Sequence, residues 1–339
     1  MFNSPADPPI RFPATQKPLL LVTVDTEEEF DWSKPHDSAN TRVTHIPAQE
    51  RAQSVFARFG LKPTYFVDYP VASQPHAYEP LRAWADRGEC EIGAHLHPWV
   101  NPPIEEQVCN RLSYPGNLDA DLERRKLAGL TDLIERNFGR RPTVYRAGRY
   151  GAGPNTAAIL ETLGYEIDSS VVPRTDLSRD EGPDFSAFGF DPYWFGTTRK
   201  LLEIPVGLGW TGLLSAAGPF WQRLSQSGWG RACRLPGVLA RARLFDRIKL
   251  TPEGIGLPDL CRVSEAMYAA GYRVFNLMYH SPSLAPGHTP YVRNEAELDQ
   301  FVRRIEGYCE FFFGRLGGIA ATPDDVRSLC LALGRKSAA

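Results

Sequence analysis

Short, almost continuously apolar runs alternate along the chain with stretches in which apolar residues recur at helical spacing. Seven runs have the length and the β-branched, aromatic or leucine content of strands, and each is bounded by glycine, proline or charge. They cover 19–25, 63–69, 91–97, 143–148, 166–171, 200–206 and 273–280. Helical patterns cover 47–59, 79–87, 119–137, 155–163 and 258–270, and a last pair covers 295–315 and 323–333.

Local signals mark two of the predicted helices. Asn155 is a residue type that caps helix N-termini, and Gly164 stands where a C-terminal glycine belongs. Thr322, Pro323 and Asp325 together make a helix-start signature.

Alternation of strand and helix predicts an α/β fold with a parallel sheet, either open or closed into a barrel. The runs 19–25 and 273–280 are nearly continuous in apolar character, as expected for strands buried on both faces. Polar residues stand at or near the ends of the runs, where barrel and doubly wound folds place their active sites. These residues are Asp25, His95, His97, Arg146, Asp168 and His280.

Charge balance and length limit the classes of protein that this chain can belong to. The chain has 339 residues, with 38 lysines and arginines against 40 aspartates and glutamates and a net charge of −2. That balance argues against a dedicated nucleic-acid binder, which normally carries a basic excess. The length allows two domains or one large α/β barrel, and the sequence does not indicate an oligomeric state.

The expected location is the cytoplasm. None of the six cysteines forms a CxxC pair or a zinc-finger spacing, which favours unpaired thiols in a reducing compartment. Residues 1–18 hold five prolines and lack the apolar centre of a secretory signal. No run reaches the 18 or so apolar residues of a membrane span.

Two histidines suggest a metal site. In the string EIGAHLHPW, His95 and His97 stand two residues apart, so on a strand both side chains point to the same face, about 7 Å apart. Two imidazoles on one face can converge on one divalent ion. The alternative is two unrelated polar residues that leave a strand, one of them turned by Pro98.

The acidic string TVDTEEEFDW follows the first strand. Asp25 and Glu27 share a face if the chain stays extended, so one can bind a metal and the other can act as a base. The alternative is a solvated acidic loop. The hypothesis gains weight because this string could face the histidine pair.

Two further strand ends carry candidate residues. A buried arginine normally needs a carboxylate, and for Arg146 the candidates are Asp25 and Asp168. Arg149, nearby, could equally be a surface arginine. His280 closes an apolar strand, so it is either a site residue or a hydrogen-bonded core histidine.

The order VTVD, GAHLHP, YRAGRYG and LMYHSP resembles the motif series of the polysaccharide deacetylase (NodB-homology) superfamily, and more narrowly its WalW-type branch. The resemblance runs from about residue 19 to residue 280. It implies a distorted (β/α)7 barrel that removes acetyl groups from N-acetylated sugars with a bound zinc or similar divalent ion. It also implies one deacetylase domain at 18–335, preceded by an irregular N-terminal segment at 1–17.

The resemblance assigns the base and the metal ligands. Asp25 matches the family's catalytic base, and His95 and His97 match its two metal-binding histidines. The family usually has a second aspartate directly after the first, as a metal ligand. Here that neighbour is Thr26, and Glu27 is the expected substitute. The family's histidines are usually four apart, whereas these are two apart.

The remaining roles come from the later motifs. Arg146 matches the arginine that hydrogen-bonds the base, and His280 matches the general acid. Tyr150 matches the residue whose backbone N–H helps to hold the oxyanion. Asp168 stands where the family has a further acidic residue near the site.

The expected function is therefore metal-dependent hydrolysis of an amide C–N bond in an N-acetylated sugar. Two alternatives stay open: a non-catalytic carbohydrate-binding relative, and an amidohydrolase of a small non-sugar amide. A cytosolic sugar intermediate or a lipid-linked glycan fits a cytoplasmic location. Aromatic residues near the motif loops suit stacking on sugar rings. They are Trp32, Trp99, Tyr150, Trp194 and Trp210.

The segment 207–250 breaks the strand–helix rhythm and carries seven basic residues against one acid, Asp246. The basic residues are Arg223, Arg231, Arg234, Arg241, Arg243, Arg247 and Lys249. We expect a helical insertion here. It is either an ordinary one with solvated arginines, or a lid beside the site that meets an anionic membrane or a phosphate-linked glycan.

Overall fold

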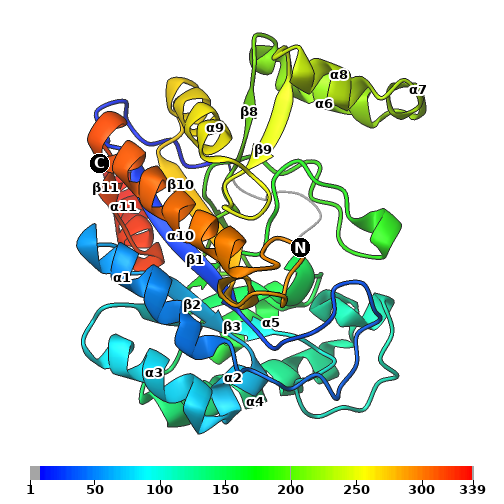
Figure 1. Ribbon diagram of the computed structural model, residues 1–339. Coiled ribbons are helices and arrows are strands. Elements are labelled where there is room, and N and C mark those ends of the chain that lie inside the picture. The colour runs from blue at the N-terminus through cyan, green and yellow to red at the C-terminus, as the bar shows by residue number, and fades with distance from the viewer. Residues whose placement is uncertain (1–7, 199, 338–339) are drawn as a thin grey trace.

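Seven parallel strands form the centre of the molecule in the computed structural model, which describes residues 8–198 and 200–337 (Figure 1). Their spatial order is β10-β1-β2-β3-β4-β5-β7, and each neighbouring pair is parallel. They are β1 (Leu19–Thr26), β2 (Thr64–Val67), β3 (Glu91–Leu96), β4 (Val144–Ala147), β5 (Ile167–Asp168), β7 (Leu201–Glu203) and β10 (Val274–His280). β6 (Tyr193–Phe195) pairs antiparallel with β7, and β11 (Ile319–Ala320) pairs with the start of β1.

The sheet curls into a barrel that is interrupted between β7 and β10. A separate antiparallel ribbon, β8 (Leu208–Thr211) and β9 (Asp246–Lys249), lies in this interval. The backbone N–H of Met278 in β10 donates to the carbonyl of Leu250, 3.0 Å away. Gly207 is required here, because a Cβ at this position would lie 2.1 Å from the carbonyl oxygen of Asn276. The distorted (β/α)7 barrel predicted from the sequence is confirmed.

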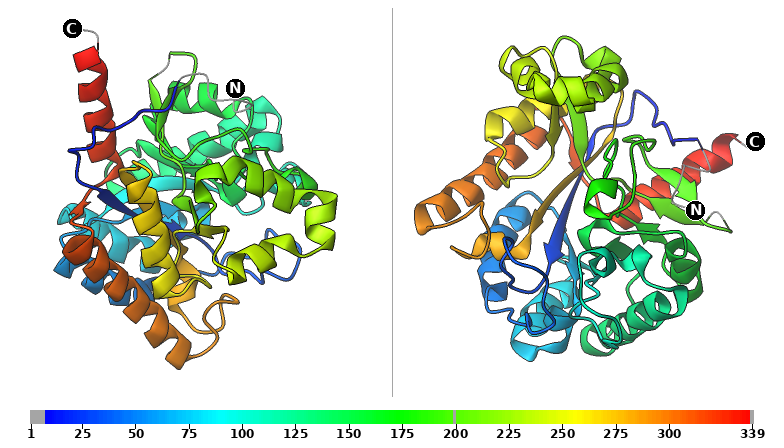
Figure 2. Two further views of the ribbon diagram at one scale, coloured as in Figure 1. Left: turned by 90° about the horizontal axis from the view of Figure 1, so that it is seen from above. Right: turned by 90° about the vertical axis from the view of Figure 1, so that its right-hand side faces the viewer.

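Helices cover the outside of the strands, and Figures 1 and 2 show them packed around the barrel. They are α1 (Glu50–Arg58), α2 (Tyr69–Ser73), α3 (Pro75–Asp86), α4 (Ala120–Phe138), α5 (Thr156–Leu163), α9 (Leu257–Ala269), α10 (Glu295–Glu310) and α11 (Pro323–Ser337). None of the helices in the described ranges combines the length and apolar character needed to cross a bilayer.

Alternation along β1 separates two apolar cores. Leu20, Val22 and Val24 belong to the cluster between strands and helices, whereas Leu19 and Leu21 belong to a second cluster inside the barrel. Because side chains alternate along a strand, the inward face continues with Thr23 and then Asp25. The barrel interior is therefore apolar at the amino ends of the strands and polar at the carboxyl ends.

Several predicted boundaries differ from the structure for local reasons. The run 63–69 ends as a strand at Val67, because the Asp68 side chain accepts from the Val71 N–H and caps α2. The strand predicted at 166–171 covers only two residues, because Ser169 and Ser170 turn their hydroxyls to β4.

All three predicted helix signals stand at helix ends. Asn155 is the N-cap residue of α5, where its carbonyl accepts from the Ile159 N–H, but its side chain makes no capping bond. Gly164 ends the same helix in the left-handed conformation, with φ of 84°. At α11, the Thr322 N–H donates to Asp325 and the Asp325 N–H donates back to the Thr322 hydroxyl, which forms a reciprocal cap.

The insertion predicted to be helical is a ribbon with helices at its tip. β8 leads into α6 (Gly218–Gln226), α7 (Gly228–Ala232) and α8 (Leu235–Arg241), and β9 leads back. Figures 1 and 2 show these three helices projecting from one end of the body.

Candidate active site

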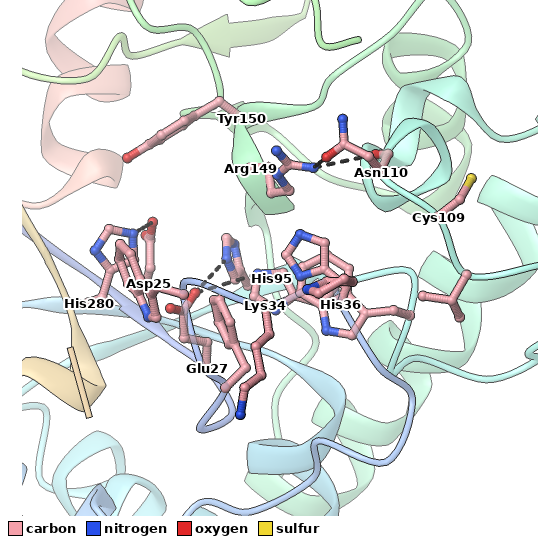
Figure 3. Close-up of a pocket in the computed structure, with 16 residues that line it drawn as sticks. Asp25, Glu27, Lys34, His36, His95, Cys109, Asn110, Arg149, Tyr150 and His280 are labelled. Atoms are coloured by element: carbon pink, nitrogen blue, oxygen red, sulfur yellow. Dashed lines mark hydrogen bonds and ion pairs between the residues drawn. The ribbon is translucent and has the colours of Figure 1, made fainter. Parts of the chain in front are cut away.

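The carboxyl ends of the strands bring polar side chains to one cavity. In the sheet register, Asp25 on β1 lies opposite His280 on β10, and His95 on β3 lies opposite Arg146 on β4. Asp25, His95 and His280 line a cavity of 520 Å³, together with Glu27 (Figure 3). A cavity of this size is in the usual range for small-molecule sites.

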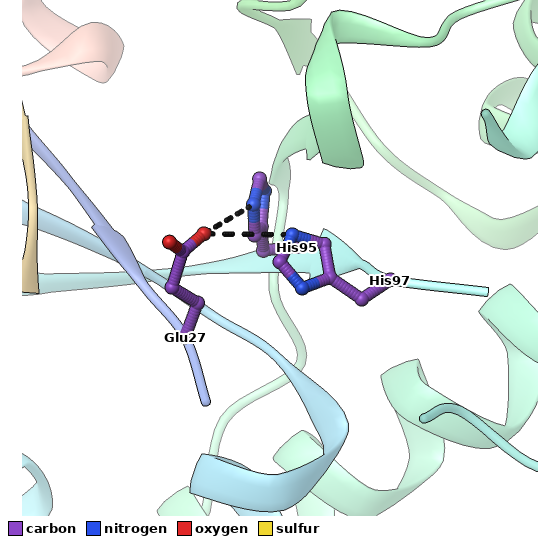
Figure 4. Close-up of side chains that lie close together, drawn as sticks. All are labelled: Glu27, His95 and His97. Carbon is purple, nitrogen blue, oxygen red and sulfur yellow. Dashed lines mark ion pairs between the residues drawn. The ribbon is translucent and has the colours of Figure 1, made fainter. Parts of the chain in front are cut away.

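Three metal-donor atoms converge on one side of this cavity (Figure 4). The Glu27 Oε2 lies 3.6 Å from the His95 Nε2 and 3.5 Å from the His97 Nε2. All three residues are 2% exposed, and the Glu27 Oε1 is buried without a hydrogen-bond partner. Two imidazoles and a carboxylate are a common catalytic zinc set, so these residues fit a divalent metal ion.

Electrostatics at this triad also fit a cation. Burial, with the nearby carboxylates of Glu28 and Asp25, raises the pKa of Glu27 well above its ordinary value. A buried carboxylate in this state needs a proton or a positive charge. A divalent ion would supply that charge.

The outward nitrogen of each histidine is held by the protein. The Nδ1 of His95 contacts the backbone carbonyl of Arg146 at 2.9 Å, and the Nδ1 of His97 contacts the Glu28 Oε2 at 2.7 Å. Burial lowers the pKa of His95 to about 3 and that of His97 to about 4, so both rings are neutral. With the proton on Nδ1, each Nε2 is left as a metal acceptor, which is the usual outer arrangement around metal-binding histidines.

Glu28 is a residue that the sequence analysis missed. Its carboxylate accepts from His97 and, at 2.6 Å, from the indole N–H of Trp99. Its backbone N–H donates to Asp68, 2.7 Å away. Burial raises the pKa of Glu28 to about 7 and that of Asp68 well above its ordinary value, so these two carboxyls can share a proton. The alternative of a solvated acidic loop after β1 is excluded.

The structure shows which carboxylate pairs with Arg146. It is fully buried, and its Nη1 donates to the Asp25 Oδ1 at 2.5 Å. Its other donors bond Thr23 and Ser169, and its guanidinium lies 4.5 Å from the centre of the Phe66 ring. Burial alone would raise the pKa of Asp25, but Arg146, together with His95 and His280, more than offsets this and keeps the pKa well below its ordinary value. Asp25 is therefore ionised.

His280 lies beside Asp25 at the cavity and is oriented by Glu253. Its Nδ1 lies 2.8 Å from the Glu253 Oε2, and its Nε2 lies 3.8 Å from the Asp25 Oδ2. The Glu253 Oε1 accepts from the His280 N–H and from the Ser283 hydroxyl. The ring of Trp32 meets the His280 ring edge-on, with centroids 4.9 Å apart. Glu253 was not among the predicted site residues, because it lies in a loop without a motif signal.

Asp168 does not line the cavity. It lies on β5, fully buried, and accepts from the Ser170 hydroxyl at 2.5 Å. Its carboxyl is also in hydrogen-bond contact with Glu203 on β7, and burial raises the pKa of Asp168 to about 6. It is not the partner of Arg146. Its position supports the segment whose Ser169 holds that arginine, rather than contact with a substrate.

Tyr150 and Arg149 form the opposite wall of the cavity (Figure 3). Both have left-handed backbones, with φ of 60° and 53°, which is uncommon for such side chains and is often found at functional sites. Arg149 is not a free surface arginine, because it donates to Asn110 at 2.8 Å. The Tyr150 hydroxyl accepts from Lys249 at 2.6 Å. Burial lowers the pKa of Lys249 to about 8.

Trp99 lines the cavity but is only 1% exposed. Its ring stacks on His97, with centroids 4.2 Å apart, and on His36, with centroids 4.0 Å apart. The structure thus gives Trp99 a supporting role for the histidine and for Glu28. Contact with a substrate stays a prediction for this residue.

Comparisons with known proteins identify the fold. No protein-family model matches the chain, and no curated protein matches its sequence. A solved structure from Mycobacterium smegmatis, described as a polysaccharide deacetylase, aligns with a TM-score of 0.55 at 20% identity, over 98% of this chain and 96% of that one. The chain has the fold of the NodB-type polysaccharide deacetylases.

Two further structures of this fold point to different substrates. A protein from Pseudomonas aeruginosa PAO1 described as a polysaccharide deacetylase has a TM-score of 0.56, and Puue allantoinase has a TM-score of 0.54. Each is 16% identical and covers 95% of this chain and 93% of its own. Fold likeness at these identities does not select a substrate. The narrower WalW-type resemblance stays a prediction.

Proposed function

We propose that this protein is a metal-dependent amide hydrolase that removes the acetyl group of an N-acetylated sugar. One observation carries the proposal. A buried metal-donor triad, an ionised aspartate and an oriented histidine all face a single cavity. The deacetylase fold supports the same reading.

The proposed metal ligands are Glu27, His95 and His97, and the donor types suit Zn²⁺. When bound, a divalent ion supplies polarisation of the amide carbonyl and a water of lowered pKa. The protein's part is to keep both histidine Nε2 atoms unprotonated and the carboxylate in place.

Asp25 is the proposed general base. Arg146 occupies its Oδ1, which leaves the Oδ2 free to take a proton from the attacking water. The same arginine keeps the carboxylate ionised, so the base is ready at neutral pH. Its low pKa makes Asp25 a weak base, so it would need the metal to lower the pKa of that water.

His280 is the proposed general acid. An amine leaves poorly unless its nitrogen is protonated, so an acid is needed in addition to the base. Glu253 holds the Nδ1 and fixes the ring orientation. The Nε2 then points towards the cavity, where it can give its proton to the leaving nitrogen.

Tyr150 and Trp32 are the proposed contacts to the oxyanion and to the sugar ring. The left-handed backbone at Tyr150 turns this segment towards the cavity, and its N–H is the proposed donor to the oxyanion. Trp32, half-buried beside His280, is better placed than Trp99 to stack on a sugar ring.

Hydrolysis of a small non-sugar amide is the second candidate. Puue allantoinase shares the fold, and the cavity is walled by aromatic and polar side chains on several sides. The third reading, a non-catalytic sugar-binding protein, is disfavoured because a pure binder needs neither the Arg146–Asp25 pair nor the Glu253–His280 pair.

The cytoplasm is the proposed compartment, and a sugar intermediate or a lipid-linked glycan is the proposed substrate there. All six cysteines are free thiols, as is usual in a reducing environment.

The decisive experiment compares substrates on one enzyme preparation. Purified protein is stripped with a chelator, reloaded with Zn²⁺, and assayed for acetate release from N-acetylglucosamine oligosaccharides and for ring opening of allantoin. Zinc-dependent acetate release, absent in His95→Ala, supports deacetylation. Allantoin turnover alone would select the second candidate, and sugar binding without turnover would select the third.

A further inference from the structure

The arm, defined here as residues 208–249, projects from the body as the β8–β9 ribbon with α6, α7 and α8 at its tip (Figures 1 and 2). It is firmly attached at its base. The Gln222 side-chain amide donates to the carbonyl of Arg174, and the Arg247 guanidinium donates to the carbonyl of Pro173 at 3.1 Å. Arg247 is therefore a structural residue of the ribbon and not part of a free basic surface.

The tip exposes large apolar side chains. Eight large hydrophobic residues are exposed in the described part of the chain, and half of them lie on this arm. Their exposed fractions are 84% for Leu213, 57% for Phe220, 63% for Trp229 and 54% for Val238. Such a concentration on one projecting element marks an interaction surface.

Positive charge surrounds these apolar side chains. Five exposed arginines lie on the tip: Arg223, Arg231, Arg234, Arg241 and Arg243. The only acid of the arm is Asp246, which lies at the base of the ribbon and contacts Arg262 of α9 at 3.4 Å. Since the whole chain has a net charge of −2, the body carries a negative excess that the arm does not share.

Apolar and basic residues are interleaved at short range. Phe220 and Arg223 are three residues apart on α6, so they are neighbours on one helix face. On α8, Val238 lies one turn from Arg234, whose carbonyl accepts the Val238 N–H at 3.2 Å. The Leu213 N–H donates to the Arg243 carbonyl at 3.3 Å, which places these two residues side by side.

We propose that the arm docks the protein on an anionic lipid bilayer. Apolar side chains can enter the boundary between headgroups and acyl chains, while arginines pair with lipid phosphates, and this surface offers both at once. A soluble polyanion would use the arginines but would leave Leu213 and Trp229 in water. The acidic body would be repelled by the same bilayer, so binding would present the tip to the membrane. This inference does not depend on the proposed catalytic function.

Vesicle binding tests the proposal directly. Intact protein is mixed with vesicles of phosphatidylglycerol and phosphatidylcholine, and with vesicles of phosphatidylcholine alone, and sedimentation gives the partition coefficient. We expect binding to the anionic vesicles only. It should weaken as salt rises, because surface charge is screened within about 8 Å at physiological ionic strength. A blue shift in tryptophan fluorescence that is lost in Trp229→Phe should accompany binding.

Two matched variants separate the contributions. Arg234→Gln, Arg241→Gln and Arg243→Gln combined should weaken binding about 100-fold, at about fivefold for each charge near the surface. The control removes three exposed basic residues of the body, Lys62, Arg136 and Arg140, and should lose little binding relative to the wild type, far less than the arm variant.

The apolar contribution has its own pair of variants. Phe220→Ser with Trp229→Ser should weaken binding, while Ile104→Ser with Leu331→Ser, at exposed apolar positions on the body, should not. Thermal unfolding checks that all variants remain folded. The proposal is overturned if intact protein ignores anionic vesicles at low salt, if the arm variants bind as well as the controls, or if only a soluble polyanion such as heparin is bound.

Discussion

At the scale of single residues, the site is organised by charges buried next to one another. Glu27 and Glu28 are adjacent in sequence but turn to different partners. The Glu27 carboxylate lies next to both histidine Nε2 atoms, whereas the Glu28 carboxylate contacts the Nδ1 of His97 on the other side of the ring. Asp25 has its own counter-charge in Arg146. Removing one member of such a pair leaves the charge of the other buried and unpaired, which lowers stability. Effects on stability and on activity must therefore be measured separately.

Asp25 is predicted to be the base, and its loss affects both properties. Asp25→Asn keeps an acceptor for Arg146 but leaves the arginine charge buried without a counter-charge. We expect kcat/KM to fall at least 100-fold and the melting temperature to drop. Adding Arg146→Met should return part of the stability and none of the activity. Full activity in Asp25→Asn would contradict the assignment of Asp25 as the base. If the double variant lost as much stability as the two single variants together, the buried pairing of Asp25 with Arg146 would be contradicted.

His280 is predicted to protonate the leaving group, with Glu253 as its positioning residue. His280→Ala and Glu253→Gln should both lower kcat on an N-acetylated sugar, and the deficit should shrink on an N-acetylated aniline, whose leaving group needs less protonation. His76→Ala, an exposed histidine on α3, is the matched control. An equal deficit on both substrates would mean that His280 is only structural.

At the scale of elements, the interruption of the barrel is the main departure from regular geometry. The β8–β9 ribbon enters between β7 and β10, and its strand β9 carries Lys249 to Tyr150 at the cavity wall. The same insertion that forms the projecting arm therefore also completes the site. The ribbon can approach β10 closely because the residue at its start, Gly207, has no side chain.

Gly207→Ala places a Cβ against the backbone carbonyl of Asn276, which cannot move away as a flexible side chain could. We expect a loss of about 1–3 kcal/mol in the free energy of unfolding, measured by denaturant titration. Gly189→Ala is the control, because a Cβ there meets no atom within 4 Å. Equal stability of the two variants would show that the ribbon adjusts at this point.

Glu123 joins α4 to α5 and gives a pH-dependent prediction. It is fully buried, accepts from the Thr156 hydroxyl, and burial raises its pKa to about 7 from 4.5. As the pH rises from 4.5 to 7, the unfolded chain loses this proton while the folded chain keeps it, so stability present at low pH is lost across this window.

Glu123→Gln removes that loss and keeps the acceptor. Its melting temperature relative to wild type should therefore be higher at pH 8 than at pH 5, by the equivalent of a few kcal/mol at most. Asp132→Asn, at an exposed position of the same helix, is the matched control. A relative gain of the same size in the control would contradict the prediction.

At the scale of the whole molecule, the chain combines an acidic body that contains the site with a basic arm that projects from it. The body provides a barrel whose inward face changes from apolar to polar along each strand. Stability of that polar end depends on what neutralises Glu27, because burial and neighbouring carboxylates raise the pKa of this residue well above its ordinary value.

Metal binding should therefore stabilise the entire fold. Zn²⁺ at 100 times its Kd should add about 2.7 kcal/mol to the free energy of unfolding and raise the melting temperature. His97→Ala should abolish the rise, and Glu28→Gln should weaken metal affinity 10- to 100-fold, as loss of an outer hydrogen bond does. His76→Ala should behave as wild type. A zinc-induced rise that persists in His97→Ala would place the metal elsewhere.

The sequence determined the architecture and the main candidates by periodicity. The apolar runs predicted the seven parallel strands, and their polar ends predicted a site. Of the predicted residues, Asp25, His95, His97 and His280 line one cavity, Arg146 supports Asp25 from behind it, and Asp168 does not reach it. These inferences hold because strand faces alternate strictly and because parallel strands end on one side. The choice of Asp25 over Asp168 as the partner of Arg146 was left open, since both residues end strands.

Only the tertiary structure decided which distant residues complete the site. Glu253 and Lys249 reach it from a loop and an interrupting ribbon, and no local pattern marks a residue whose role depends on a neighbour in space. Glu28 looked like one member of an acidic loop until burial placed it behind His97. Arg247 was expected to be a solvated charge, but in the structure it is half-buried and donates to the Pro173 carbonyl. Periodicity reports a side chain's direction from its own strand, whereas desolvation and partner choice depend on everything that packs against it.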